Sequence, residues 1–535
     1  MPPEILKIMI IPHNAYEKTS RLFTKRPQGL SPQSSLTFSP FNLFIFFTFF
    51  TFCLLPFTLF AQKSTSKDSK HKLVFNVKDC NEEQMLLVVH YNGKMMLKDS
   101  TYFKGKGVYI FEGEGKYEEG MYSLVSGTKK LMLDFIMDEP QQFTYNLDTT
   151  RNVNNLSVVG SPENEEMIRF QQKSTEARKK MTDFSKKRKD FEDTGMKDSA
   201  SYYADKMMTV NMNMEQYIDR LIEDKPSLLF SKLQKSYKEI AIPNPPVNKD
   251  GSIDSTFQLP YFITHYWDNF DLADRRFLFL PTYDSKLKDY FHKYLWYQPS
   301  DTINKYMDMM LEKTSGDSLM YRFLTQFLSS EFEQSKIIGH DAVFVHLVKN
   351  NQLAGKCSWL DEDILKKYKM RIEDLEPMLI GKKSVELILP DTSQTDNYTK
   401  WFSSYNMPKR HRILWFYDHT CATCKKEGLE LKAVYDSLEN IGKLNFDVYA
   451  VNETKDIDRW KKYIIDNGYT WINVGGAKGN VNWREAYHIT TNPQFYIINR
   501  EKIIILNRNI SKDMIPRFLA DYEREEAEKV RKKNN

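Results

Sequence analysis

The stretch that decides the fold is Trp415-Phe416-Tyr417-Asp418-His419-Thr420-Cys421-Ala422-Thr423-Cys424-Lys425-Lys426-Glu427. Its first three residues end the segment Arg412–Tyr417, which is apolar apart from its ends, as is typical of a buried strand. The pattern from Cys421 to Leu438 is helical, so the two cysteines stand where a strand leads into a helix. CxxC alone is a weak signal, but CxxC at a strand-to-helix junction is a specific sign of thiol–disulfide exchange.

The two cysteines are expected to have different roles. A thiol at a helix N-terminus faces unpaired amide hydrogens and the positive end of the helix dipole, and both favour the thiolate. We therefore expect Cys421 to be the exposed, attacking sulfur. Cys424, one turn further in, should resolve the mixed disulfide.

The sequence predicts no metal and no cofactor. Zinc at the CxxC pair would need two further ligands, and neither a second CxxC nor a His pair accompanies it. His340 and His346 are six residues apart and do not share a helix face. The segment 248–253 resembles the middle of a calcium-binding loop, but Pro246 and Phe257 would occupy the outer ligand positions, so a turn is expected there.

An alternating α/β pattern surrounds the cysteine pair from Gly381 to the C-terminus, and it predicts a mixed sheet with helices on both faces. The expected strands are Val385–Leu389, Arg412–Tyr417, Phe446–Val451, Gln494–Ile498 and Lys502–Leu506. The expected helices are Cys421–Leu438, Asp456–Asp466, a short one at Asn482–Tyr487 and a terminal one from about Ser511. Residues 381–535 are therefore predicted to form one domain.

The segment from Val385 to about Ala520 resembles the TlpA-like extracytoplasmic thioredoxins, a family of envelope thiol–disulfide oxidoreductases. Besides the cysteine segment, the stretch 487–499 (YHITTNPQFYIIN) is similar to the one that bears the family's cis-proline. The resemblance implies that Glu427 tunes the cysteine pair and that Pro493 lies against the disulfide. It also implies that the Asn492 backbone is free to pair with a bound substrate strand.

Several residues depart from the family pattern. Trp415 replaces the buried acid that many thioredoxins carry six residues before the first cysteine, which leaves Glu427 as the candidate replacement. Gly428 stands where members of the family commonly have proline, and it is expected to loosen the helix. Thr420 replaces the tryptophan that often precedes the first cysteine. His419 either stabilises the thiolate when protonated or faces solvent as a loop residue.

Two further domains are expected upstream, which makes the chain a multidomain α+β protein. Residues 63–160 contain about seven alternating runs separated by Gly, Asn and Asp, which predicts an antiparallel β-domain, a small sandwich or open barrel. Ser161-Pro162-Glu163-Asn164 is a helix-start signal, and a helical pattern then continues to about residue 380, with a charged first stretch read as solvated helix surface. Both parts resemble N-terminal modules of uncharacterised function found in Bacteroidetes envelope proteins.

The leader, residues 1–62, predicts export. Phe41–Ala61 is an uncharged apolar run, which fits a cleaved signal peptide or an uncleaved membrane anchor. The leader carries +3 of the chain's net charge of +5, so the near-neutral remainder has no electrostatic footprint for nucleic acid. Of the five cysteines, Cys53 lies in this run and only Cys80 and Cys357 remain besides the pair, too few for a disulfide scaffold.

The leading hypothesis is an exported thiol–disulfide oxidoreductase of the periplasm or cell envelope. Its partners would be protein thiols and disulfides of exported proteins, apocytochrome c among the classes implied by the resemblance, together with a membrane or envelope reductant. An envelope binding or scaffold protein with an accessory redox domain is the alternative. A thiol peroxidase would need threonine at the position of Asp418. The direction of electron flow stays open, because CxxC potentials vary by more than ~100 mV within one fold.

Overall fold

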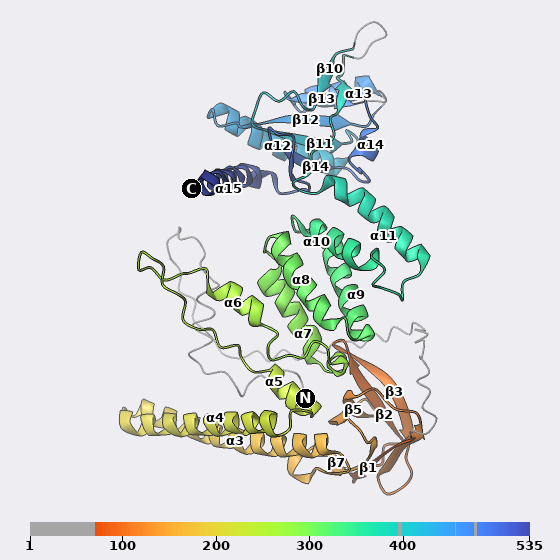
Figure 1. Cartoon of the computed structure of the whole chain (residues 1–535), viewed down its shortest axis with the longest axis vertical. Coiled ribbons are helices and arrows are strands. Elements are labelled where there is room, and N and C mark those ends of the chain that lie inside the picture. Colours follow the sequence, from red (N-terminus) through yellow and green to blue (C-terminus); the bar gives the residue numbers. More distant parts are fainter. Residues whose placement is uncertain (1–69, 394–398, 455, 476–478, 535) are drawn as a thin grey trace. The chain divides into compact units, whose positions relative to one another are not determined.

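The computed structural model describes residues 70–393, 399–454, 456–475 and 479–534, so the predicted signal or anchor segment lies outside the described residues. The chain divides into two compact units (Figure 1). Among the described residues, one unit consists of Lys70–Gln258 together with His265–Lys288, and the other of Leu259–Thr264 together with those from Asp289 onward. Among the described residues, no helix combines the length and the apolar composition needed to cross a membrane.

The first unit begins with a β-sandwich. Between residues 70 and 160, all of which are described, the strands are β1 (Lys70–Lys78), β2 (Gln84–Tyr91), β3 (Lys94–Tyr102), β4 (Val108–Glu114), β5 (Gly120–Ser126), β6 (Leu131–Met137), β7 (Gln142–Asp148) and β8 (Ser157–Val159). They form two sheets with the orders β4-β1-β7-β8 and β3-β2-β5-β6. Phe75 of one sheet and Phe135 of the other have ring centroids 5.4 Å apart, so the two sheets share one core.

Two features of this domain differ from the sequence prediction. The domain is not purely antiparallel, because β1 and β7 pair in parallel, with Leu73 opposite Phe143. Period-two alternation reports that one face of a strand is buried, but it does not report the direction of the neighbouring strand. Strand β3 was missed because it lies at a sheet edge and is exposed along most of its length, as Met95 and Leu97 show, so it lacks the alternation.

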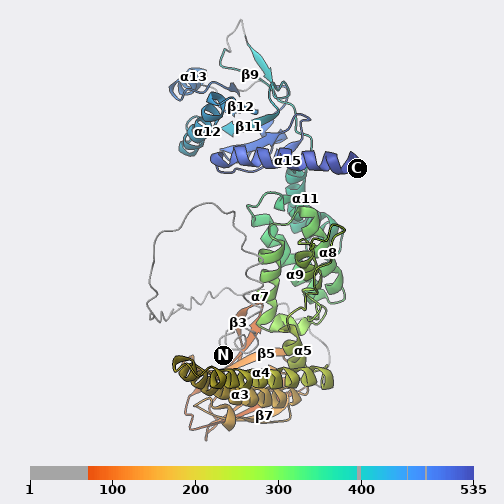
Figure 2. The same ribbon diagram turned by 90° about the vertical axis from the view of Figure 1, so that its left-hand side faces the viewer.

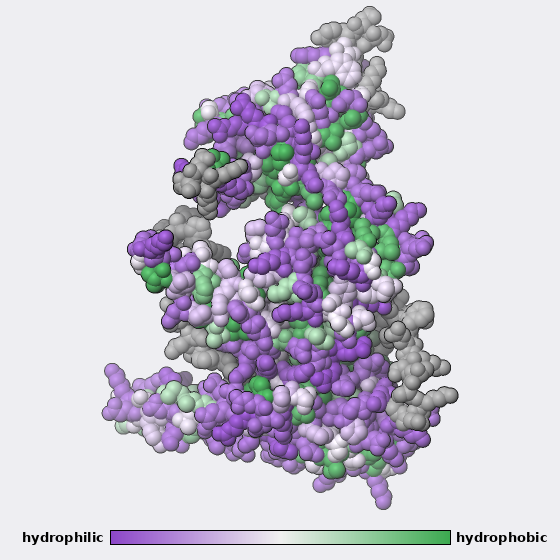
Figure 3. Space-filling model, viewed as in Figure 1, coloured by the Kyte–Doolittle hydropathy of each residue, from purple (hydrophilic) through white to green (hydrophobic). Residues whose placement is uncertain are grey.

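The helices of the first unit are α3 (Pro162–Asp193), α4 (Lys197–Asp224), α5 (Leu229–Ser236) and α7 (Thr282–Asp289), with 3-10 turns η1 (Val153–Asn155) and η2 (Arg275–Phe279). Helices α3 and α4 lie side by side as a hairpin (Figure 2). Much of the visible hairpin surface is hydrophilic (Figure 3), which agrees with the predicted solvated face. The start signal is confirmed, because the Ser161 side chain accepts the Asn164 amide hydrogen bond at 3.3 Å.

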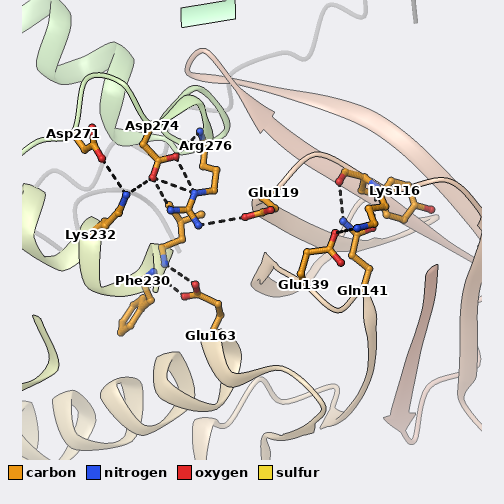
Figure 4. Close-up of polar contacts among 12 residues, drawn as sticks. Lys116, Glu119, Glu139, Gln141, Glu163, Phe230, Lys232, Asp271, Asp274 and Arg276 are labelled. Atoms are coloured by element: carbon orange, nitrogen blue, oxygen red, sulfur yellow. Dashed lines mark hydrogen bonds and ion pairs between the residues drawn. The ribbon is translucent and has the colours of Figure 1, made fainter. Parts of the chain in front are cut away.

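A charged cluster ties the sandwich to α5 and η2 (Figure 4). The buried Glu163 carboxylate accepts hydrogen bonds from the backbone amides of Leu229 and Phe230, at 2.5 and 2.9 Å. It thereby pairs two amides at the start of α5 that have no partner within the helix. Arg276 joins the cluster to the sandwich through Glu119 at 3.3 Å. Glu163, an acid in the first turn of α3, therefore also stabilises the start of a second helix.

The second unit starts with α-helices, two π-helices (η3 and η4) and one 3-10 turn (η5), which precede the C-terminal sheet. They are α6 (Gln258–His265), η3 (Tyr290–Leu295), α8 (Ser300–Thr314), α9 (Ser318–Gln334), α10 (His340–Leu347), η4 (Val348–Gln352), α11 (Glu362–Leu375) and η5 (Glu376–Met378). The predicted domain boundaries at 160 and 380 fall where the element type changes, from β8 to α3 and from η5 to β9. The division into two compact units instead passes through the helical segment.

A five-stranded mixed sheet follows. Its strands are β11 (His411–Tyr417), β12 (Phe446–Asn452), β13 (Ile472–Gly475), β14 (Gln494–Ile498) and β15 (Ile504–Leu506), in the order β13-β12-β11-β14-β15. Strands β11, β12 and β13 are parallel, whereas β14 and β15 are antiparallel to their neighbours. The predicted strand at 385–389 is instead part of a separate hairpin of β9 (Ile388–Pro390) and β10 (Trp401–Ser403).

Helices cover both faces of this sheet, as predicted. They are α12 (Ala422–Asn440), α13 (Ile457–Asp466), α14 (Trp483–Ala486) and α15 (Ile515–Asn534), with the 3-10 turn η6 (Lys512–Met514) before α15. Leu431 of α12, Trp460 of α13 and Leu519 of α15 pack on one face, and Trp483 of α14 packs on the other. Every residue of β11 is buried, because it is the central strand between these two layers.

Candidate redox site

A short turn after β11 presents the cysteine pair. The Asp418 carboxylate accepts hydrogen bonds from the amide and the hydroxyl of Thr420, both at 2.8 Å, and the Asp418 carbonyl accepts the Cys421 amide at 3.1 Å. Burial acts to raise the pKa of Asp418, but the Thr420 hydrogen bonds and the nearby cationic groups outweigh it, so the pKa lies below its ordinary value. The turn is therefore held by an ionised carboxylate, and it places Cys421 at the N-cap of α12.

The two thiols differ in access. Cys421 is half-buried, and its Sγ accepts the Cys424 amide hydrogen bond at 3.3 Å. Cys424 is fully buried, and burial, with the hydrogen bond to Cys421 adding to it, raises the pKa of its thiol to about 12. Both cysteines are free thiols in the structure. Cys421 is thus the more accessible of the two thiols, and Cys424 stays protonated at neutral pH.

Aromatic rings form the wall behind Cys424. Trp415, at the position of the missing acid, is fully buried and stacks on Tyr417 at a centroid distance of 4.2 Å. A Cβ on Gly428 would lie 2.2 Å from Tyr469 Oη and 2.6 Å from Trp415 Cη2. The sequence suggested that Gly428 loosens the helix, but the structure gives it a packing role: it lets α12 approach these rings.

Glu427 lies one turn after Cys424 and has a cationic partner that the sequence analysis missed. Lys512, whose side chain is only 2% exposed, donates to Glu427 Oε2 at 3.0 Å and to the Ile510 carbonyl at 3.2 Å. Its ammonium also lies 4.3 Å from the ring centroid of Phe495 on β14. The ion pair and the ring contact together fix η6 against α12 and β14. No local pattern could have indicated the pair, because 85 residues separate its members.

The expected substrate segment lies at the same end of the sheet. The Asn492–Pro493 peptide bond is cis, as the resemblance implies. Because Gln494 pairs with Phe416, Pro493 lies at the end of β11 from which the cysteine turn departs. The Asn492 side-chain amide donates to the Glu453 carboxylate at 3.5 Å, and the Asn509 side-chain amide donates to the Pro493 carbonyl at 3.1 Å.

The surroundings of His419 correct one of the two sequence interpretations. Its side chain is only 6% exposed, so it is not a solvent-facing loop residue. Its ring packs against Tyr463 of α13 at a centroid distance of 6.1 Å. Both ring nitrogens are buried and have no hydrogen-bond partner in the described part of the chain. Nδ1 lies 3.7 Å from Asp418 Oδ1, an ion-pair contact only when the imidazole is protonated.

Among the described residues, no group of three or more His, Cys, Asp or Glu side chains is placed to hold a metal ion. The predicted turn at 248–253 is formed, and the Asp250 carboxylate there accepts hydrogen bonds from the amide and hydroxyl of Ser252.

Known proteins resemble parts of this chain. Residues 231–377 match a family described as a domain of unknown function (DUF5106). No curated protein matches the sequence. A thioredoxin-like protein from Bacteroides caccae aligns with 53% of this chain and 99% of its own, at 17% identity and a TM-score of 0.40.

Two further solved structures each align with about a quarter of the chain. A domain of a possible thiol–disulfide isomerase from Cytophaga hutchinsonii covers 28% of this chain and 95% of its own, with 28% identity and a TM-score of 0.24. A thiol–disulfide oxidoreductase from Bacteroides fragilis covers 26% of this chain and 98% of its own, with 17% identity and a TM-score of 0.23. The chain is thus similar, over part of its length, to thioredoxin-like proteins of several bacteria.

Proposed function

We propose that this chain is a thiol–disulfide oxidoreductase that acts on protein disulfides through Cys421 and Cys424. The observation that carries the proposal is the asymmetry of the pair: Cys421 caps α12 and is partly accessible, whereas Cys424 is fully buried behind it. The Cys421 thiolate attacks a substrate disulfide to form a mixed disulfide. Cys424 then attacks Cys421, which releases the reduced substrate and leaves the pair oxidised.

Export to the cell envelope is part of the proposal, and the support for it is the apolar run Phe41–Ala61 with its basic flank. In that compartment, the partners would be disulfides of exported proteins and a membrane or envelope reductant. Membership of the TlpA-like group, the tuning role of Glu427 and the use of Asn492 and Pro493 by a substrate strand are proposals of the same kind. They are supported by the resemblance of the two quoted segments.

The test compares insulin reduction by the full-length protein and by three serine variants. Cys421→Ser should abolish activity because no attacking thiolate remains. Cys424→Ser should accumulate a stable mixed disulfide with the substrate, detectable by mass spectrometry, because attack succeeds and resolution fails. Cys357→Ser is the matched control, since that buried cysteine lies outside the site. Full activity in Cys421→Ser would refute the proposal, and trapping by Cys421→Ser instead would reverse the two roles.

A further inference from the structure

The segment that carries Pro493 is irregular, and its middle is exposed. Residues 489–493, all of which are described, lie between α14 and β14 and belong to no helix or strand. Ile489 is buried in the core of the domain, whereas Thr490 and Thr491 are exposed. Such a segment is held in one shape by contacts at its ends, because it lacks the regular backbone hydrogen bonds of a helix or a strand.

Arg484 of α14 holds the first end of this segment. Its carbonyl accepts the hydrogen bond of the Ile489 amide at 2.8 Å, and its Nη1 donates to the Ile489 carbonyl at 3.0 Å. The guanidinium carbon lies 5.1 Å from the ring centroid of Trp483, which stacks on Phe416 of β11 at a centroid distance of 5.5 Å. Arg484 therefore binds both backbone groups of Ile489 and packs on a ring that contacts the central strand.

Glu453, the residue after β12, holds the other end. Its Oε2 pairs with Nη2 of Arg484. The same oxygen accepts a hydrogen bond from the Asn492 side-chain amide at 3.5 Å. The Arg484–Glu453 pair, which we call the bridge, thus contacts the segment at Ile489 and at Asn492, on both sides of its exposed middle.

The bridge adds little to the stability of the fold. The side chains of Arg484 and Glu453 are 34% and 44% exposed, so water screens their charges, and both side chains lose conformational freedom when they pair. What the bridge restricts is the conformational freedom of residues 489–493. A segment that already has its bound shape costs less to order when it captures a partner.

We propose that Arg484 and Glu453 are positioning residues for the capture of protein substrates, because their bridge holds residues 489–493 ready to receive an extended strand. This rests on the proposed function, in which the Asn492 backbone pairs with a substrate strand beside the cysteine pair. Neither side chain takes part in thiol–disulfide exchange. The bridge serves disulfides that lie within an extended protein segment, whereas a small disulfide reaches Cys421 without strand pairing and does not use it.

The test compares a protein disulfide with a small one in the full-length protein. Insulin reduction with excess dithiothreitol as the final reductant gives kcat and KM for a protein substrate. The first phase of the reaction with 5,5′-dithiobis(2-nitrobenzoate), followed by stopped flow, gives the rate of attack by Cys421 without strand pairing.

Arg484→Met keeps an unbranched apolar side chain against Trp483 and removes the guanidinium donors. It should raise KM for insulin roughly tenfold and leave kcat and the small-disulfide rate within about twofold. The reason is that a bound strand orders residues 489–493 by its own hydrogen bonds, so the loss affects binding and not the chemical step.

Glu453→Ala removes the other half of the bridge and should show the same pattern. Because the two residues act as one unit, the double variant should have about the KM of either single variant and not the product of two effects. Arg517→Met is the matched control, since it removes an exposed arginine of the same domain whose partner at 3.7 Å, Asp521, lies on the same helix, α15. It should leave KM, kcat and the small-disulfide rate unchanged.

A wild-type KM in Arg484→Met would overturn the proposal, and so would a small-disulfide rate that falls as much as kcat/KM for insulin. Multiplicative effects of the two substitutions would overturn it as well, because they would show that Arg484 and Glu453 act independently. If Arg484→Met does not fold, a wild-type KM in Glu453→Ala overturns the proposal instead. A wild-type protein that reduces no insulin would contradict the proposed function itself.

Discussion

Replacing Gly428 with alanine tests how the aromatic wall supports the cysteine helix. The added Cβ would lie 2.2 Å from Tyr469 Oη, 2.6 Å from Trp415 Cη2 and 3.0 Å from Tyr469 Cζ. Neither ring is free to move away. Tyr469 stacks on Trp471 at 4.7 Å, and Trp415 stacks on Tyr417 at 4.2 Å.

The size of the effect follows from two opposing terms. Alanine has a higher helix propensity than glycine by about 1 kcal/mol, which favours the variant. Overpacking a rigid core costs about 1–3 kcal/mol, and the upper end applies to Gly428 because displacing either ring also weakens a stacked pair. We therefore expect Gly428→Ala to destabilise α12 by about 2 kcal/mol.

Hydrogen–deuterium exchange of the full-length protein measures this effect locally. Because about 1.4 kcal/mol corresponds to a factor of ten, the amides of α12 should exchange about 30-fold faster in Gly428→Ala. Gly316→Ala is the control, since no atom lies within 4 Å of its added Cβ and its φ is not positive. Exchange in α12 as slow as in wild type would refute the packing role of Gly428.

Two further predictions concern buried charges. Burial raises the pKa of Asp138 from 3.8 to about 7, so the folded state binds this proton more tightly than the unfolded state, and stability is lost as the pH rises through that range. Asp138→Asn should thus raise the thermal unfolding midpoint more at pH 8 than at pH 5. An equal shift at both pH values would contradict the raised pKa of Asp138. Lys512→Met leaves the Glu427 carboxylate without its cation and should cost about 1–3 kcal/mol in urea unfolding. Lys432→Met breaks the more exposed ion pair with Asp436 on α12 and should change the free energy of unfolding by no more than about 0.5 kcal/mol. An equal loss of stability in both variants would refute the structural role of Lys512.

The parts of the fold that the sequence predicted are those with a strong local signal. Strand β11 is apolar from Ile413 to Phe416 because helices cover both of its faces, and the cysteine turn follows the strand directly. The start of α3 was visible because Ser161 and Pro162 carry the capping chemistry within four residues. Strand β3 gave no signal, since an exposed edge strand needs no alternation.

The parts of the site that the sequence did not predict depend on contacts between distant segments. Lys512 looks like a surface lysine beside Ser511 and Asp513, and only the fold brings it to Glu427. The packing role of Gly428 depends on Tyr469, which comes from the loop after α13. The burial of His419 depends equally on α13, because Tyr463 covers the ring. Spacing within one segment carries no information about these neighbours.

A redox titration of the Cys421–Cys424 couple against glutathione tests the central claim most directly. The full-length protein would be equilibrated over a range of ratios of reduced to oxidised glutathione, quenched with an alkylating reagent and mapped by mass spectrometry. We predict a single two-electron transition in which both cysteines lose their alkylation together and a peptide linked through Cys421 and Cys424 appears, while Cys357 stays reduced. Independent alkylation of the two cysteines at every ratio, with no linked peptide, would contradict the account.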